Sequence, residues 1–185
     1  MMRELSDNIM DIAQNSISAG AALTEVHVKV SHADNLITFV FQDDGCGMSE
    51  ELVQSVIEPF TTTRKTRKVG LGLPLLKQTA EMTGGTLDIR STVGVGTTVT
   101  ATFGLDHIDR PPMGDVAGAW FSLVVMNPEK EFLFTYDYDG QVFTFDTRDI
   151  RAAVAPIPLN QMEISAWIQE CLQSEINELH GGNFT

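Results

Sequence analysis

The sequence predicts an α+β fold in which helices and β-hairpins follow one another along the chain. Three observations carry this prediction. Apolar residues recur at helical spacing through residues 3–19, apolar and polar residues alternate strictly in 24–30, and further strands flank a glycine-rich turn at 93–96. The expected order over residues 1–105 is helix, hairpin, helix, helix, hairpin. Residues 106–185 are expected to add a second, smaller α+β domain.

Composition and charge narrow the classes of function. The chain has 185 residues, of which 43% are hydrophobic and 20% charged, as in soluble globular proteins. Its net charge of −13 argues against nucleic acid or an anionic membrane as a partner, because a polyanion binds to a basic face. The sequence lacks both the ~20 apolar residues of a membrane helix and a signal-peptide pattern, so a cytoplasmic protein is expected. Its two cysteines indicate neither a disulfide framework nor a zinc site.

The first expected helix, residues 3–19, is amphipathic. Ile9 and Ile12 belong to its apolar face, and Asp11 and Asn15 lie four positions apart on a polar stripe that borders this face. Here a carboxylate can orient a water molecule, while an amide oxygen can bind a magnesium ion. An ordinary solvated stripe is the alternative interpretation.

The expected strand at 35–42 runs directly into the loop DDGCGM. Gly45 and Gly47 allow this loop to turn sharply and to approach a flat ligand closely. Asp43, at the strand end, can accept a hydrogen bond from an exocyclic amine such as that of adenine. A simple turn is the alternative interpretation. A short helix is expected next, at about 49–57.

A basic segment, TTTRKTRKVG, leads into the glycine-containing stretch GLGLPLL. Four of the chain's 12 basic residues lie in it, namely Arg64, Lys65, Arg67 and Lys68. Backbone N–H groups at the start of the following helix can bind an anion, and the basic side chains can add charge-assisted hydrogen bonds. The stretch matches neither a Walker A loop nor the dinucleotide-binding fingerprint. A solvated surface loop is the alternative interpretation.

The remaining elements complete the expected order. Strands at 86–92 and 97–103 flank the turn VGVG, and a Pro-containing linker follows from about residue 105. The C-terminal region is expected to contain a helix, a hairpin joined by Asp139–Gly140, and a last helix at about 160–179. None of the four histidines lies in the context HExxxP of a phosphoacceptor helix, so each is expected to be a surface or hydrogen-bonded residue.

Five short motifs in fixed order resemble the GHKL superfamily, the histidine-kinase-like ATPases that include histidine kinases, gyrase B, large heat-shock chaperones and MutL proteins. DIAQNSISAGA resembles the N box, DDGCGM the G1 box, EPF the F box, GLGL the G2 box and GVGTT the last glycine–threonine motif. The resemblance covers residues 3–105. It implies a two-layer sandwich of the Bergerat type, with helices on one face of a mixed, largely antiparallel sheet, that binds ATP and Mg²⁺.

The resemblance also implies a role for each matched position. Asp11 takes the place of the general-base glutamate of the MutL and gyrase branches, and it would be the catalytic residue. Asn15 would bind magnesium, Asp43 would recognise adenine and Thr97 would support Asp43. Contacts to the pocket floor and the phosphates are implied for Gly45, Gly47, Arg64, Lys65, Gly70, Leu71, Gly72 and Leu73.

Three functions are compatible with these motifs. The favoured one is a stand-alone protein kinase that acts in trans on an unidentified protein partner or phosphoacceptor, since no phosphoacceptor hairpin precedes the N box. The others are an ATPase switch that acts through partner binding and a nucleotide-binding module without turnover. Residues 106–185, with 13 acidic and 4 basic side chains, are expected to serve in docking or regulation, or to be a structural extension. The oligomeric state is left open.

Overall fold

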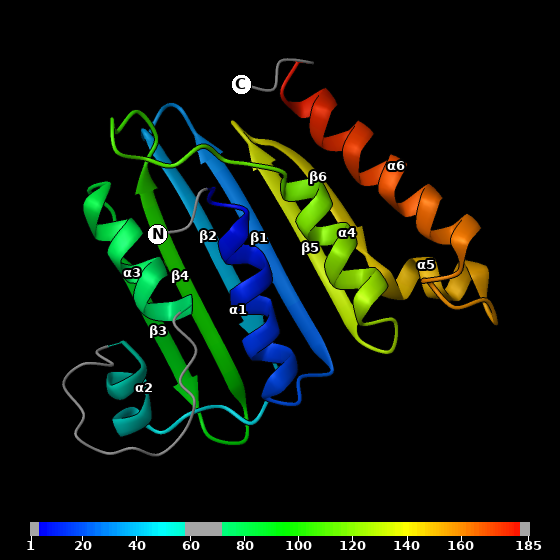
Figure 1. The fold of residues 1–185 in the computed structure, drawn as a ribbon, viewed down its shortest axis with the longest axis horizontal. Coiled ribbons are helices and arrows are strands. Elements are labelled where there is room, and N and C mark those ends of the chain that lie inside the picture. The colour runs from blue at the N-terminus through cyan, green and yellow to red at the C-terminus, as the bar shows by residue number, and fades with distance from the viewer. Residues whose placement is uncertain (1–3, 58–71, 182–185) are drawn as a thin grey trace.

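The computed structural model describes residues 4–57 and 72–181, and their elements alternate much as the sequence predicts (Figure 1). The order helix, hairpin, helix, helix, hairpin is confirmed for the first half. In the described residues the helices are α1 (Asp7–Ser18), α2 (Glu50–Ile57), α3 (Gly72–Met82), α4 (Val116–Met126), α5 (Thr147–Val154) and α6 (Met162–Leu179). The strands are β1 (Leu23–Ser31), β2 (Leu36–Asp43), β3 (Leu87–Thr92), β4 (Gly96–Gly104), β5 (Glu131–Tyr138) and β6 (Gln141–Asp146).

All these strands form one six-stranded sheet in the order β3-β4-β2-β1-β5-β6. Neighbouring strands are antiparallel except β1 and β5, which are parallel. The predicted α+β class and mixed, largely antiparallel sheet are therefore confirmed, and α1, α3 and α4 lie on one face of the sheet (Figure 1). Strands from both sides of the predicted boundary at residue 105 pair in this sheet, while the division into two domains stays a prediction. Within the described residues, no helix has the length and apolarity needed to cross a membrane.

The core lies between the sheet and these helices. Strict alternation in β1 and β2 turns every second side chain inward, among them Val28 and Phe39, while α1 contributes Ile9 and Ile12 from its apolar face. Burial of each such side chain stabilises the fold by about 1.5–3 kcal/mol. The same pleat decides which residues at the strand ends face α1, and this positions the candidate site.

Helix α5 is the one described helix that the sequence analysis missed. Its N-cap, Asp146, accepts a hydrogen bond from the backbone N–H of Arg148, and its side chain also pairs with the Arg148 guanidinium at 2.6 Å. The sequence DTRDIRAAV therefore carries a helix-start signal. The signal is hard to recognise in the sequence because α5 follows strand β6 without an intervening turn.

Candidate functional site

The carboxylate of Asp43 is held in a fixed orientation at the end of β2. Its Oδ2 atom accepts a hydrogen bond of 2.7 Å from the hydroxyl of Ser16, and its Oδ1 atom accepts one of 2.9 Å from the backbone N–H of Gly45. Ser16 is buried on α1, and Asp43 is half-buried. Since each carboxylate oxygen has two lone-pair sites, the group can still accept a hydrogen bond from a ligand amine.

Ser16 lies on the apolar, buried side of α1, and the motifs imply no role for it. The detectable signal was a serine at a core-facing position, because a buried hydroxyl needs a hydrogen-bond partner. Its partner lies 27 positions further along the chain, and only the packing of α1 on β2 brings the two together.

The glycines of the DDGCGM loop are required by close approaches. A Cβ atom on Gly45 would lie 2.9 Å from both the Oδ1 atom of Asp43 and the Cβ atom of Ala19. Gly47 has a φ of +66°, and a Cβ atom there would overlap the carbonyl oxygen of Thr92. The loop thus lies directly against α1 on one side and the β3–β4 hairpin on the other.

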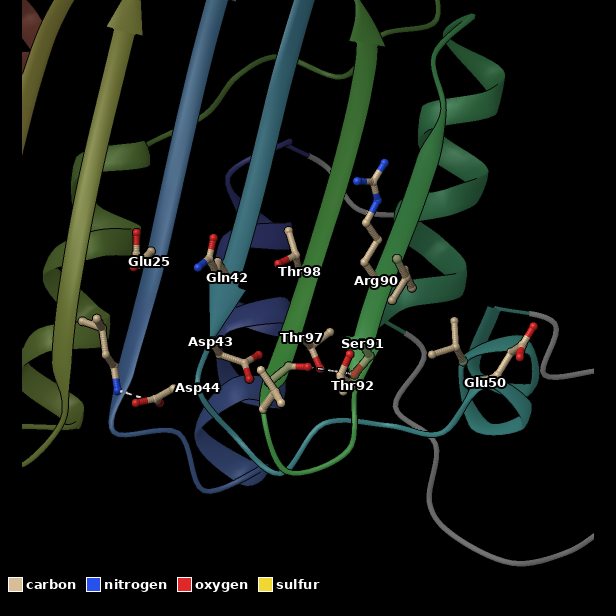
Figure 2. Close-up of a pocket in the computed structure, with 15 residues that line it drawn as sticks. Glu25, Gln42, Asp43, Asp44, Glu50, Arg90, Ser91, Thr92, Thr97 and Thr98 are labelled. Carbon is tan, nitrogen blue, oxygen red and sulfur yellow. Dashed lines mark hydrogen bonds between the residues drawn. The ribbon is translucent and has the colours of Figure 1, made fainter.

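Thr97 lies opposite Asp43 in the β2–β4 pairing (Figure 2). Its hydroxyl is 2.8 Å from the hydroxyl of Ser91, which in turn accepts a hydrogen bond of 2.7 Å from the backbone N–H of Met48. Among the described residues, the hydroxyl that hydrogen-bonds the Asp43 carboxylate is that of Ser16, whereas the Thr97 hydroxyl pairs with Ser91. Thr97 and Ser91 tie the strand ends to the loop that follows Asp43.

The start of α3 meets α1 at Asp11. A Cβ atom on Gly72 would lie 3.3 Å from the Cβ atom of Asp11, and Leu73 is buried beside it. Asp11 and Asn15 both have exposed side chains one turn apart on α1. Partial desolvation raises the pKa of the Asp11 carboxyl, and the nearby charge of Asp7 raises it further.

Four predicted site residues, Arg64, Lys65, Gly70 and Leu71, lie outside the described residues. Their expected contacts with phosphate stay predictions. Among the others, Asp43 and Thr97 pair at the strand ends, and Gly72 lies beside Asp11 of α1, one turn from Asn15.

A cavity of about 590 Å³ lies at this end of the sheet (Figure 2). Asp43, Gly96 and Thr97 are in its lining, which extends across the strand ends to Glu50 and Arg90. Asp11 and Asn15 do not line it. The cavity opens on the helix-free face of the sheet, because Gln42, Arg90 and Thr98 in its lining alternate with the core-facing residues of their strands (Figure 2). Ser16 of α1 contacts the Asp43 carboxylate from the other side.

Comparison with known proteins points to the same part of the chain. The family described as histidine kinase-, DNA gyrase B-, and HSP90-like ATPase matches residues 1–107. A tetrathionate sensor histidine kinase of Salmonella typhimurium is 32% identical over 103 residues, which are 54% of this chain and 17% of that protein. Sporulation kinase D of Bacillus subtilis is 31% identical over 94 residues, which are 51% of this chain and 18% of that protein. The chain thus covers less than a fifth of either relative.

A solved structure has a similar fold. The crystal structure of the N-terminal domain of a DNA repair protein matches with a TM-score of 0.55 and 15% identity, over 77% of this chain and 52% of that one. At this identity the match concerns the fold alone.

Proposed function

The chain belongs to the family of histidine kinase-, DNA gyrase B- and HSP90-like ATPases, and we propose that it binds ATP with magnesium and phosphorylates a protein partner in trans. The observation that carries the proposal is the Asp43 carboxylate, fixed by Ser16 and Gly45 at the end of β2 on the side of α1. Adenine offers an exocyclic amine that this carboxylate can bind. The two glycines of the same loop let it pack directly against Ala19 and Thr92, which fixes the loop beside the carboxylate.

The phosphates are proposed to extend from the Asp43 carboxylate along α1 toward the start of α3. Backbone N–H groups at the first turn of α3, at Gly72 and Leu73, suit an anion, and the sequence places Arg64 and Lys65 shortly before them. The exposed side chain of Asn15 has no hydrogen bond to any described residue, so its amide oxygen is available as a magnesium ligand. When bound, the ion would neutralise phosphate charge.

Asn15→Ala is expected to weaken ATP binding in the presence of magnesium by roughly 5-fold or more, because one oxygen ligand is lost. The affinity for ADP, which offers fewer phosphate oxygens, should fall less. Isothermal calorimetry with and without magnesium measures both effects. The neighbouring exposed residue supplies a matched control, Gln14→Ala, which should bind as wild type. Equal affinities of wild type with and without magnesium would contradict the assignment.

Asp11 is proposed to act as the base that accepts a proton from the attacking group. A base works in its ionised form, and the raised pKa of Asp11 means that it becomes protonated at a higher pH than an ordinary aspartate. ATP turnover should therefore fall on the acid side at a correspondingly higher pH.

Asp7→Asn removes a negative charge near Asp11, so it should lower the pKa of Asp11 and move the acid limb of the turnover profile to lower pH. Kinetics across the acidic range measure this shift. Asp88→Asn, on the distant exposed face of β3, is the control and should leave the profile in place. A profile that is the same in Asp7→Asn and wild type would exclude Asp11 as the titrating base.

An ATPase switch that acts through partner binding is the second candidate function, favoured by the Asp11 carboxylate beside Gly72. ATP labelled at the γ-phosphate distinguishes the two. The kinase transfers label to another protein chain, whereas the switch releases inorganic phosphate only. If ATP binds but neither a labelled protein nor inorganic phosphate appears, both candidate functions are contradicted. The acidic residues 106–185 are proposed to contact the partner in either case.

A further inference from the structure

In the described part of the chain the sheet has two edge strands, β3 and β6, which differ in how they are protected from pairing with another strand. Strand β3 exposes the charged side chains of Asp88 and Arg90, which form an ion pair at 2.9 Å. Strand β6, with the sequence QVFTFD, contains no proline and no charge before its last residue. Its pairing with β5 is continuous, so no bulge turns it away. Strand β6 therefore lacks the features that normally block an edge.

The hairpin geometry determines which backbone groups of β6 point outward. Strands β5 and β6 are joined by a two-residue turn at 139–140, and its φ angles of 51° and 86° are those of a type I′ turn. The pair that closes such a turn, Tyr138 and Gln141, exchanges both backbone hydrogen bonds, and the direction then alternates along the strand. The N–H and C=O groups of Val142 and Thr144 therefore point away from β5, and no described residue pairs with them.

The side chains of β6 can contact an added strand on both faces of the sheet. Phe143 pairs with the buried Tyr136 and faces the helix layer, yet it is only half-buried, whereas Phe145 on the same face is buried. On the helix-free face Val142 is 56% exposed, and Thr144 is exposed beside it. A strand next to β6 would cover Phe143 with one of its faces and Val142 with the other. Apolar side chains therefore suit both faces of such a strand.

Helix α6 contacts β6 and borders this edge with negative charge (Figure 1). It carries four glutamates and no lysine or arginine, and the sequence contains neither of these two residue types after Arg151. The glutamates are Glu163, Glu170, Glu175 and Glu178. This charge favours a basic partner, and it disfavours a second copy of a chain whose net charge is −13.

We propose that β6 is the docking edge for an extended, basic segment of the protein partner, which adds to the sheet as a further strand. The proposal rests on the proposed function for the existence of a partner, and it names the chemistry that the partner must offer. Backbone hydrogen bonds to Val142 and Thr144 supply affinity. Apolar side chains over Phe143 and Val142, and basic side chains near α6, supply specificity. The edge lies outside residues 1–107, which the family matches, so it belongs to the C-terminal region of this chain.

Amide hydrogen exchange in the free protein tests whether the edge is open. The amides of Val142 and Thr144 should exchange about 100-fold faster than those of Phe143 and Phe145, which donate to β5. Equal protection of all four amides would show that the edge is already covered, and this result would overturn the proposal.

The probe for docking is a short peptide in which valine and threonine alternate between terminal lysines. Its titration, followed by NMR, should shift and protect the Val142 and Thr144 amides, with an affinity in the micromolar range. Methylation of one alternate set of peptide amides should abolish binding, whereas methylation of the other set should change it by less than about 2-fold, because only one set faces β6. Equal effects of the two methylations would overturn strand addition, and this comparison leaves the protein itself unchanged.

Variants of the peptide and of the protein test charge and position. Glutamates in place of the peptide lysines should weaken binding roughly 10-fold or more. Val142→Lys should weaken it by a similar factor, because a lysine on the edge repels a basic strand. Val95→Lys, at a 67% exposed valine of the β3–β4 turn, is the matched control and should bind as wild type. If the two lysine variants bind the peptide equally well, the peptide docks elsewhere and the proposal fails.

These measurements need no ATP, so their outcomes are separate from those of the proposed function. An open edge that does not bind the basic peptide overturns the docking proposal and leaves nucleotide binding intact. Peptide docking at β6 without any ATP binding overturns the proposed function alone. Sedimentation velocity of the chain by itself covers the remaining occupant: a dimer that Val142→Lys abolishes would assign the edge to a second copy and overturn the proposal.

Discussion

Replacing Asp43 with alanine is expected to weaken ATP binding roughly 5- to 150-fold, which corresponds to about 1–3 kcal/mol. The carboxylate is fixed at the end of β2 by two donors and can still accept a hydrogen bond from adenine. Its loss leaves the exocyclic amine without a partner and Ser16 and the Gly45 N–H without an acceptor. Wild type should prefer ATP over GTP, because a guanine base offers no amine at the same position. Asp43→Ala should lose this preference.

Calorimetric titration with ATP and GTP measures this change. Asp88→Ala provides a matched control, since this carboxylate is exposed on β3 and pairs with Arg90 at 2.9 Å. Ser16→Ala keeps the Asp43 carboxylate but removes one of the donors that orient it, so it should fall between wild type and Asp43→Ala. If Asp43→Ala binds ATP as tightly as wild type, the base lies elsewhere.

Local sequence patterns predicted most strands and helices because each depends on a short period. Alternation in residues 24–30 predicted β1, and helical spacing predicted α1. The partner of a strand depends on residues far away in sequence. Nothing in EFLFTYDY indicates that β5 pairs in parallel with β1, 108 positions earlier from Leu23 to Glu131. The single six-stranded sheet therefore emerged only from the structure.

In the candidate site, too, local positions are predictable from the sequence, whereas contacts between distant segments are not. Motif order located Asp11, Asn15 and Asp43 along the chain, and the structure places the first two on α1, the helix whose Ser16 contacts Asp43. The contact of Ser16 with Asp43 and the packing of Gly72 on Asp11 join segments that are distant in sequence. Spacing along one helix predicts which residues share a face, but it does not predict what that face meets.

The C-terminal region is connected to the candidate site through one packed layer. Trp120 of α4 is fully buried and stacks on Phe134 of β5, with ring centroids 4.7 Å apart. It also meets the ring of Tyr136 edge-on at 6.1 Å. Strand β5 pairs with β1, and β1 pairs with β2, which ends at Asp43. Packing around Trp120 therefore supports the strand that lies between the C-terminal hairpin and the site.

Trp120→Ala is expected to lower the free energy of unfolding by about 3–5 kcal/mol, because it removes a large buried ring and leaves a cavity between α4 and β5. Trp120→Phe should cost less, since it keeps an aromatic ring on Phe134 and removes an indole N–H that has no hydrogen-bond partner in the described residues. The matched control is Trp167→Ala on α6, where the side chain is 49% exposed and the expected change is within about 0.5 kcal/mol. Urea unfolding measures all three. If Trp120→Ala lowers the free energy of unfolding as little as Trp167→Ala does, the α4–β5 layer contributes little to stability. The C-terminal hairpin would then not support β1.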